Sequence, residues 1–135
     1  MTSDLIILED VSKVFTIGHT TVTAVSHVSL SIPRGSFCII AGASGSGKTT
    51  LLNLIGGLER PTSGGIGVGH QHLDRLNEQS LALFRRHKVG YIFQGNNLIP
   101  TLTASENVEI PLILTQAKNR KPKVVFVHFR IGMYS

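Results

Sequence analysis

The amino-acid sequence predicts an α/β fold in which an antiparallel β part is joined to an incomplete, mostly parallel core. Three observations predict this class. Residues 22–32 alternate between apolar and polar side chains, which is typical of a half-buried strand. Residues 37–41 form a short continuous apolar run, as in a parallel strand that is buried on both faces. A glycine-rich loop follows this run and leads into leucines at helical spacing, so strand, loop and helix occur in order.

The first 41 residues contain three predicted strands. Leu5–Phe15 is apolar and β-branched, and Pro33–Ser36 has the composition of a turn. Phe37–Ala41 predicts a buried strand, in which Cys38 is expected to pack into the core. Because Cys38 is the only cysteine, no disulfide can form within the chain. The alternating strand is expected to place one set of side chains on a single face: Val22, Ala24, Ser26, Val28, Leu30 and Ile32.

The middle of the chain predicts a helix and a short strand. Apolar residues recur three and four positions apart between Leu51 and Leu58, and Pro61 ends that element. Ser63–His72 contains a short strand, with Ile66 and Val68 among glycines.

Two further helices and a strand are predicted after residue 76. Asn77–His87 begins with a residue that can cap a helix and ends with basic residues, which suits the helix dipole. Val89–Phe93 predicts a strand, and Gln94–Leu102 a loop. Thr103–Glu106 has the pattern of a capping box, which opens a helix that Pro111 should bend or interrupt.

The loop Gly42–Thr49 fits the pattern G-x-x-x-x-G-K-[ST], which predicts a binding site for a nucleoside triphosphate. Glycines let the backbone turn and bring several N–H groups close to an anion, and the helix start adds its dipole. Lys48 supplies a full charge for the outer phosphates, and the Thr49 hydroxyl can ligate Mg²⁺. A flexible Gly/Ser turn with a chance lysine is the alternative, and the order of strand, loop and helix argues against it.

Charge is distributed unevenly along the chain. The first 109 residues hold eight basic and eight acidic side chains, whereas residues 110–135 hold five basic side chains and no acid. The hydrophobic content of 41% favours a globular protein over a disordered one. No segment has the roughly 20 apolar residues that a membrane span requires, and the start does not read as a secretory signal. A cytosolic protein is therefore expected.

Three stretches resemble the ATP-binding subunits of ABC transporters, most closely those of the lipoprotein-releasing and macrolide-export type. They are "LEDVSKVF", "VTAVSHVSLSIPRGSFCIIAGASGSGKTTLLNLIGGLERPTSG" and "LNEQSLALFRRHKVGYIFQGNNLIPTLTASENVEIPLIL". The resemblance implies a P-loop NTPase fold of the ABC nucleotide-binding type. The family usually has an acid and then a glycine in the hairpin turn where this chain has Gly69 and His70, so a weaker turn is expected. The nearby pair His70 and His72 is interpreted as part of a surface turn, since no third metal ligand lies near in sequence.

The resemblance also implies roles for particular residues. Phe15 would stack on adenine, although core packing is the other interpretation of this residue. Lys48 would hold the outer phosphates, Thr49 would bind Mg²⁺, and Gln94 would link Mg²⁺ and the attacking water to the coupling surface; Lys48 and Gln94 are thus the implied catalytic residues. The phosphates of ATP would be wrapped by Gly42, Ala43, Ser44, Gly45, Ser46, Gly47, Lys48, Thr49 and Thr50.

The implied function is ATP binding and hydrolysis coupled to transport through a membrane permease. The implied partners are that transmembrane permease subunit and a second ATP-binding subunit, with the protein on the cytoplasmic, inner face of the cell membrane. A P-loop kinase or a nucleic-acid-linked ATPase is the alternative from another class. Gln94 and the following "NLIPTLTASENV" argue against it, so no nucleic acid is expected.

Hydrolysis in this family needs residues that the sequence does not contain. A strand ending in an acid for Mg²⁺, then a glutamate for water, is required, but no acidic residue follows Glu109. The Ser-Gly-Gly signature that the resemblance implies is also missing, since Ser63-Gly64-Gly65 comes too early in the chain and belongs to the hairpin. The later switch histidine is missing as well, because His128 lacks the supporting sequence context. A truncated, nucleotide-binding fragment without ATPase activity of its own is therefore the alternative function. An incomplete sheet would leave an unpaired edge, so low stability and aggregation are expected.

The predicted domains are residues 1–115, the N-terminal part of an ABC ATP-binding domain, and residues 116–135, a basic tail outside the family. Three interpretations of the tail stay open. It is a foreign or out-of-frame segment, a tail that binds anionic lipid or nucleic acid, or a strand adapted to patch the sheet. The first is favoured, because the loss of resemblance coincides with the change in charge.

Overall fold

The computed structural model describes residues 4–92, 98–107, 110 and 126–128, and the chain divides into two compact units, Met1–Leu81 and Ala82–Ser135. Each unit is described by itself. The described helices and strands are, in order, β1 (Asp4–Ile17), β2 (Thr20–Pro33), α1 (Lys48–Ile55), β3 (Ser63–Val68), β4 (Gln71–His72), a 3₁₀ turn (Leu73–Arg75), α2 (Glu78–Lys88), β5 (Gly90–Ile92) and β6 (Phe126–His128).

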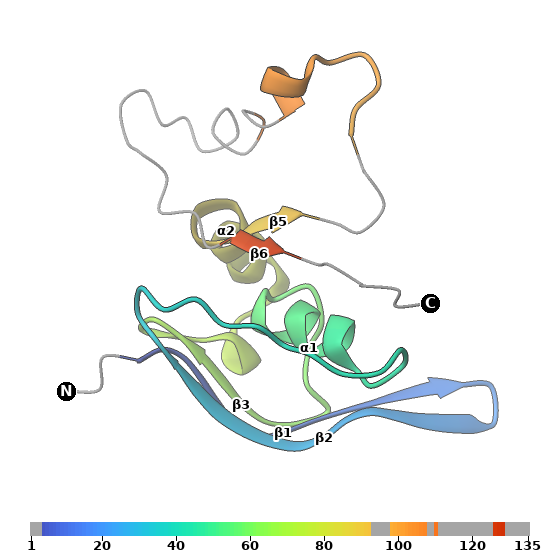
Figure 1. Cartoon of the computed structure of the whole chain (residues 1–135). Helices are drawn as coiled ribbons and strands as arrows, with labels where there is room; N and C mark the ends of the chain where they lie inside the picture. Colours follow the sequence, from blue (N-terminus) through green and yellow to red (C-terminus); the bar gives the residue numbers. More distant parts are fainter. Residues whose placement is uncertain (1–3, 93–97, 108–109, 111–125, 129–135) are drawn as a thin grey trace. The chain divides into compact units, whose positions relative to one another are not determined.

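A four-stranded antiparallel sheet forms the base of the first unit. Its strand order is β2-β1-β3-β4, and β1 and β2 form a long hairpin that extends beyond the other strands (Figure 1). Strand β1 pairs with β2 along its length and with β3 on its other edge, for example at Leu8 opposite Ile66. The predicted strand Leu5–Phe15 and the antiparallel β part are thereby confirmed.

An irregularity in the β1–β2 hairpin changes which face of β2 is buried. The pairing register shifts between Leu8 and Val11 and again after it, and Asp10 and His27 both have a φ of 51°. A bulge of this kind reverses the alternation of side chains beyond it. The predicted single face is therefore wrong for its first half, because Val25 is buried whereas Val22 and Ser26 are exposed.

The core of the first unit lies between the sheet and α1, which packs against β2 and β3. Leu54 in α1 and Ile66 in β3 are completely buried. The helix ends earlier than predicted, at Ile55, because Gly56 and Gly57 follow it, and Leu58 lies outside it and is exposed. The buried apolar residues of this unit are Ile6, Leu8, Val11, Val25, Leu54, Ile55, Ile66, Leu73 and Leu81.

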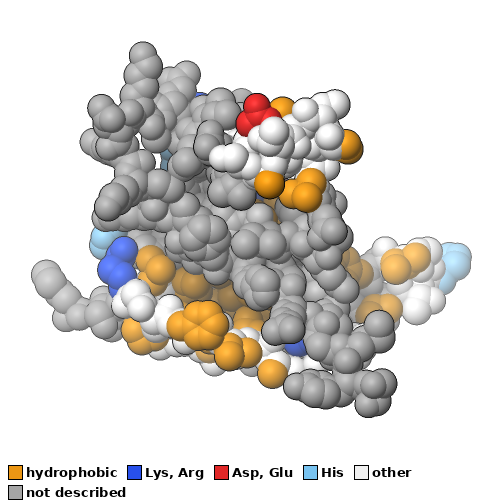
Figure 2. Space-filling view, turned by 45° about the horizontal axis from the view of Figure 1, so that its top comes forward, with side chains coloured by type: hydrophobic (Ala, Val, Ile, Leu, Met, Phe, Trp, Pro, Cys, Tyr) orange, Lys and Arg blue, Asp and Glu red, His pale blue; other side chains and the backbone are white. Residues whose placement is uncertain are grey.

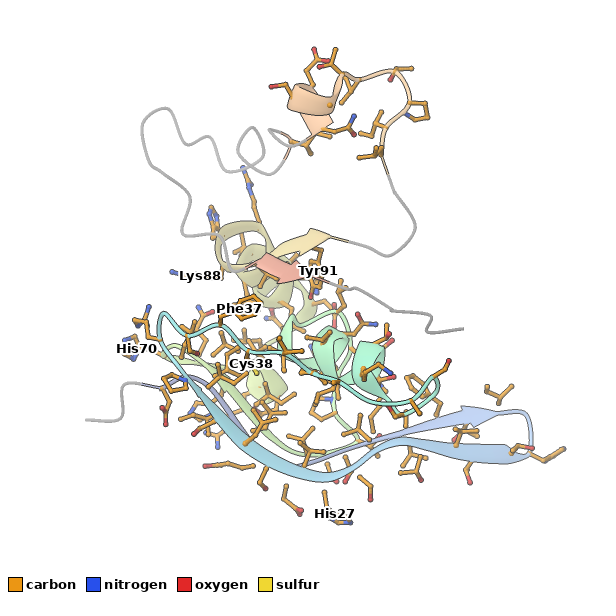
Figure 3. All side chains as sticks on the ribbon, in the orientation of Figure 1. His27, Phe37, Cys38, His70, Lys88 and Tyr91 are labelled. Carbon is orange, nitrogen blue, oxygen red and sulfur yellow. The ribbon has the colours of Figure 1, made fainter. Side chains whose placement is uncertain are left out.

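The segment before the glycine-rich loop differs most from its prediction. Phe37–Ala41 is not a strand, and the side chains of Phe37 and Ile39 are 88% and 75% exposed. Cys38 is exposed as well, so its predicted core packing is wrong. Figure 3 shows Phe37 and Cys38 on the stretch between β2 and α1. The physical reason is that, in the part of the chain that the structure describes, no strand pairs with this segment on either edge.

The β3–β4 hairpin forms despite its unusual turn. Gly67 pairs with His72 and Val68 with Gln71, which leaves a two-residue turn. Gly69 has a φ of 61°, a left-handed value that suits such a turn and that favours glycine. Gly69 and His70 are therefore compatible with the turn, although the sequence predicts a weaker turn at these two residues.

The second unit contains most of α2 and a pair of parallel strands. Tyr91 of β5 pairs with Val127 of β6, and the two strands lie side by side in Figure 1. The third interpretation of the tail, a strand that patches the sheet, requires a pairing of this kind.

The predicted caps are confirmed. In the first unit the backbone N–H of Ser80 donates to Asn77 Oδ1 at 2.8 Å, and in the second unit the N–H of Thr103 donates to Glu106 Oε2 at 2.7 Å.

Candidate nucleotide-binding loop

The glycine-rich loop reverses direction between Ala43 and Lys48 and leads directly into α1. Gly45 and Gly47 have φ values of 78° and 86°, and the N–H of Ser46 donates to the carbonyl oxygen of Ala43 at 3.2 Å. The N–H of Leu51 donates to the Gly47 oxygen at 2.8 Å, which begins the helix. The loop is thus a compact turn whose backbone curls ahead of the helix start.

Gly47 fixes the loop against the sheet. A Cβ atom at this position would lie 2.1 Å from the carbonyl oxygen of Ala24 in β2, and the left-handed φ disfavours any other residue. Only a glycine lets the loop approach the strand this closely.

The side chain of Lys48 folds back over the loop. Its ammonium group donates to the carbonyl oxygens of Gly42 and Ala43 at 2.8 and 2.6 Å, and to Ser46 Oγ at 3.3 Å. An ammonium group has three protons, so these three acceptors hold the positive charge at the centre of the loop. An anion placed there would meet a full charge in addition to backbone N–H groups.

Within the described residues, no side chain caps the N-terminus of α1. Gly47 is the N-cap and offers no side-chain hydrogen bond, and the first turn holds no acidic residue. Thr49 is exposed, and its hydroxyl has no hydrogen bond within the part of the chain that the structure describes. An uncapped helix start with its positive dipole end is a ready site for an anion, and the free Thr49 hydroxyl is an oxygen donor of the kind that Mg²⁺ accepts.

A pocket of about 450 Å³ lies between β2 and the loop. Its walls come from residues 23–26 and 28 of β2, from residues 40–42 and 46–48, and from Leu51. Sequence reasoning missed the contribution of β2, since no local signal reports which strand the loop will face.

Phe15 lies near the end of β1, and its ring is partly exposed. It does not line this pocket. The ammonium group of Lys13 lies 4.8 Å from the centre of the ring, within the range of a cation–π interaction. Sequence reasoning did not single out Lys13, and its contact with Phe15 spans the register shift between Lys13 and Val14.

In the second unit, the loop after β5 is organised by Asn107. Its amide Nδ2 donates to the backbone oxygens of Ile99, Leu102 and Thr103 at 3.3, 3.2 and 3.0 Å, and its Oδ1 accepts from the Ile99 N–H at 2.8 Å. Leu98 beside it is exposed. Gln94 and Pro111 lie outside the described residues, so the predicted role of Gln94 stays a prediction.

Within the described part of the second unit, Tyr91 and Glu106 have shifted pKa values. Burial raises the pKa of Tyr91 to about 12, and the nearby Arg85 guanidinium opposes part of that rise. The hydrogen bond from the Thr103 N–H lowers the pKa of the Glu106 carboxyl group, and the Thr103 hydroxyl adds to this effect.

Among the residues that the structure describes, no group of three or more histidine, cysteine or acidic side chains is arranged to hold a metal ion. The predicted surface position of His70 is confirmed, since it is exposed in the turn between β3 and β4. His27 points away from α1 in Figure 3, and its Nδ1 lies 2.8 Å from Asp10 Oδ1 on the outside of the sheet.

Hydrophobic side chains reach the surface in several places on the face that Figure 2 shows. The most exposed large ones in the described residues are Phe37, Ile39 and Ile17. No helix within the described ranges is long and apolar enough to span a bilayer.

Comparison with known families gives a match to the model described as "ABC transporter" over residues 25–134. The macrolide export ATP-binding/permease protein MacB of Hyphomonas neptunium is 48% identical over 135 residues, which is 98% of this chain and 21% of that protein. The lipoprotein-releasing system ATP-binding protein LolD of Geobacter metallireducens is 40% identical over 116 residues, 86% of this chain and 52% of the relative.

Solved structures also match this chain. The ATP-binding cassette MJ0796, in a dimeric post-hydrolysis state bound to ADP and Pi, superposes with a TM-score of 0.78 at 41% identity. The match covers 86% of this chain and 50% of that one. The chain therefore spans about half the length, or less, of the relatives it matches.

Proposed function

This chain belongs to the ABC transporter family, and we propose that it is part of an ATP-binding subunit that binds Mg²⁺ and ATP at the loop Gly42–Thr50. The observation that carries the proposal is the position of the Lys48 ammonium group. It lies 2.8 and 2.6 Å from two backbone oxygens of the loop, directly before an uncapped helix start. A relative of known structure binds ADP and Pi, which supports the same ligand class here.

The proposed division of work follows from the chemistry of the residues. Backbone N–H groups of the loop and of the first turn of α1 would bind phosphate oxygens, and Lys48 would exchange its carbonyl acceptors for the outer phosphates. Thr49 would hold Mg²⁺, which when bound neutralises phosphate charge, and Phe15 would stack on the base. Gln94 would contribute to the same site. Thr50 and the residues Gly42, Ala43, Ser44, Gly45, Ser46 and Gly47 would complete the phosphate cradle.

Hydrolysis is a separate proposal from binding. No acidic residue follows Glu109 in the sequence, and β6 contains none. The residues after Glu109 therefore supply neither a carboxylate that binds Mg²⁺ nor an acidic group that orients the attacking water. We therefore favour nucleotide binding by this chain, with turnover requiring residues that a longer or second chain would provide.

The same family membership supports proposals for partners and place. A transmembrane permease subunit would receive the exposed loop around Leu98, and a second ATP-binding subunit would face the Gly42–Thr50 loop. The relatives that support this are named as a macrolide export ATP-binding/permease protein and a lipoprotein-releasing ATP-binding protein. Binding to a permease subunit would place this chain on the inner face of the cell membrane.

The test separates binding from turnover. Calorimetry with ATP and Mg²⁺ should show binding by the wild-type chain, and phosphate release should stay at the level of buffer. Lys48→Ala should weaken binding about 10- to 100-fold, the range expected for losing hydrogen bonds to a charged group. Lys88→Ala, which removes an exposed lysine of α2, is the matched control and should bind as the wild type does. ATP hydrolysis that is lost in Lys48→Ala would reject the alternative that this chain binds nucleotide without ATPase activity of its own. ATP binding by Lys48→Ala as tight as that of the wild type would reject the proposed site.

A further inference from the structure

Among the residues that the structure describes, Lys13 of β1 makes the most contacts of any lysine outside the Gly42–Thr50 loop. Its ammonium group lies 2.9 Å from Glu59 Oε2, donates to the carbonyl oxygen of Arg60 at 2.8 Å, and sits 4.8 Å from the centre of the Phe15 ring. Its side chain is only 14% exposed. A lysine on a solvated strand face would normally keep its charge in water, so this arrangement fixes the side chain in one place.

Lys13 and Phe15 lie in the second half of β1, beyond the register shift that follows Val11. Burial decreases along this part of the strand, since Val11 is fully buried, Phe15 is partly exposed, and Ile17 is 72% exposed. Phe15 thus stands where the core ends. The Lys13 ammonium group lies over the ring, and part of Phe15 remains exposed to solvent.

The anchors of Lys13 belong to the segment that follows α1. Glu59 and Arg60 come four and five residues after its last residue, and the first turn of that helix carries Lys48 and Thr49. Arg60 is itself held, because its Nε lies 3.0 Å from Glu78 Oε1 and its guanidinium also donates to the Leu76 oxygen. Through Lys13, the Phe15 ring is therefore connected to the segment Glu59–Arg60, which follows the C-terminal end of α1.

We propose that Lys13 is a positioning residue for base recognition, which holds the Phe15 ring so that its open face accepts the purine of a nucleotide. This inference rests on the proposed function of the Gly42–Thr50 loop. A ring held in its bound orientation before binding loses less rotational freedom when a base stacks on it. Lys13 would act through Phe15 alone and would not touch phosphate, so its effect should depend on the presence of a base.

The experiment compares two ligands that differ in the base. Calorimetry with Mg²⁺ would measure the dissociation constants of ATP and of inorganic tripolyphosphate for the wild type, Lys13→Met and Lys13→Arg. Lys13→Met keeps an unbranched side chain but removes the charge and both polar contacts. We expect Lys13→Met to weaken ATP binding about fivefold and to leave tripolyphosphate binding within about twofold of the wild type, while Lys13→Arg stays near the wild type.

A double-mutant cycle isolates the route through the ring. Phe15→Leu should weaken ATP binding, and Phe15→Leu combined with Lys13→Met should be no weaker than Phe15→Leu alone, because the ring is already gone. Lys88→Met is the charge-matched control and should change neither ligand.

The other outcomes reject the inference in distinguishable ways. Unchanged ATP binding by Lys13→Met shows that the lysine does not matter for the base. An equal loss for ATP and tripolyphosphate shows that it only maintains the fold of the unit. If the wild type binds neither ligand, the proposed function fails, and the role of Lys13 fails with it. If it binds tripolyphosphate and ATP equally, the phosphate site stands and the base-recognition role is rejected.

Discussion

Strand β1 and the segment Phe37–Ile40 are both apolar runs, yet their environments in the molecule are opposite. Strand β1 has β2 on one edge and β3 on the other, and Leu8 in it is 2% exposed. The segment before the glycine-rich loop pairs with no strand of the described part, and Phe37 and Ile39 are exposed. An apolar run predicts a tendency to be buried, but burial itself requires partners that lie elsewhere in the sequence.

Truncating one apolar side chain in each of the two regions should change the free energy of unfolding by very different amounts. Leu8→Ala should lower the free energy of unfolding by about 3 kcal/mol, because it leaves a cavity between the strands and α1. Ile39→Ala should lower it by less than about 0.5 kcal/mol, since little of that side chain is buried. Urea unfolding of both variants measures the difference, and equal losses would show that the Phe37–Ile40 segment is buried in solution.

A second change tests how closely the loop and the sheet approach each other. Gly47→Ala should cost about 2–3 kcal/mol of stability, because its Cβ would collide with the Ala24 carbonyl oxygen in addition to the unfavourable φ. Gly45→Ala is the matched control, since φ is also positive there but nothing lies within 4 Å of the added atom. It should cost only about 1 kcal/mol. Similar losses in thermal unfolding for the two variants would mean that the loop does not contact β2.

In the second unit, the burial of Tyr91 should make the stability of the fold depend on pH. Burial raises its pKa to about 12, so the folded state favours the neutral phenol. A raised folded pKa gives stability that is complete below the unfolded pKa of about 10 and is lost as pH rises toward 12. The melting temperature should therefore fall over this range, and Tyr91→Phe should show a smaller fall. An identical fall in the variant would assign the loss to other groups.

The smallest expected effect concerns the capping box in the same unit. The Thr103 N–H and hydroxyl lower the pKa of the Glu106 carboxyl group. A lowered folded pKa gives stability that is present above the unfolded value, near 4.3, and is lost as pH falls through the folded pKa. The protection of the Thr103 N–H, measured as its exchange rate relative to an unstructured peptide at the same pH, should be lost as pH falls through the folded pKa of Glu106. Glu106→Ala should show fast exchange at neutral pH already, whereas slow exchange in that variant would contradict the box.

Local sequence patterns predicted the elements whose cause is local. The capping box at Thr103, the cap at Asn77 and the glycine-rich loop before α1 each depend on residues within a few positions, and the structure contains them. The hairpin β1–β2 was predicted as two strands, but its bulge was not, because Asp and His, although more frequent than most residues at a positive φ, adopt it only uncommonly. The burial of Val25 in place of Val22 follows from that bulge.

Non-local features could not be read from the sequence in the same way. The contact of Gly47 with Ala24 joins a loop and a strand 23 residues apart, and no periodicity reports it. The contacts of Lys13 with Glu59 and Arg60 likewise join residues far apart in the sequence, and no local pattern predicts them. The Phe37–Ala41 prediction failed for the same reason, because it assumed neighbouring strands that the described part does not supply.

We propose that the Gly42–Thr50 loop and the first turn of α1 bind the phosphates of ATP. Hydrogen–deuterium exchange of the whole chain, with and without saturating ATP and Mg²⁺, tests it most directly. With ATP, the backbone N–H groups of residues 45–50 should exchange more slowly, and those of residues 71–75 should not change. Binding of ATP that leaves residues 45–50 exchanging at their original rates would show that this loop does not hold the phosphates.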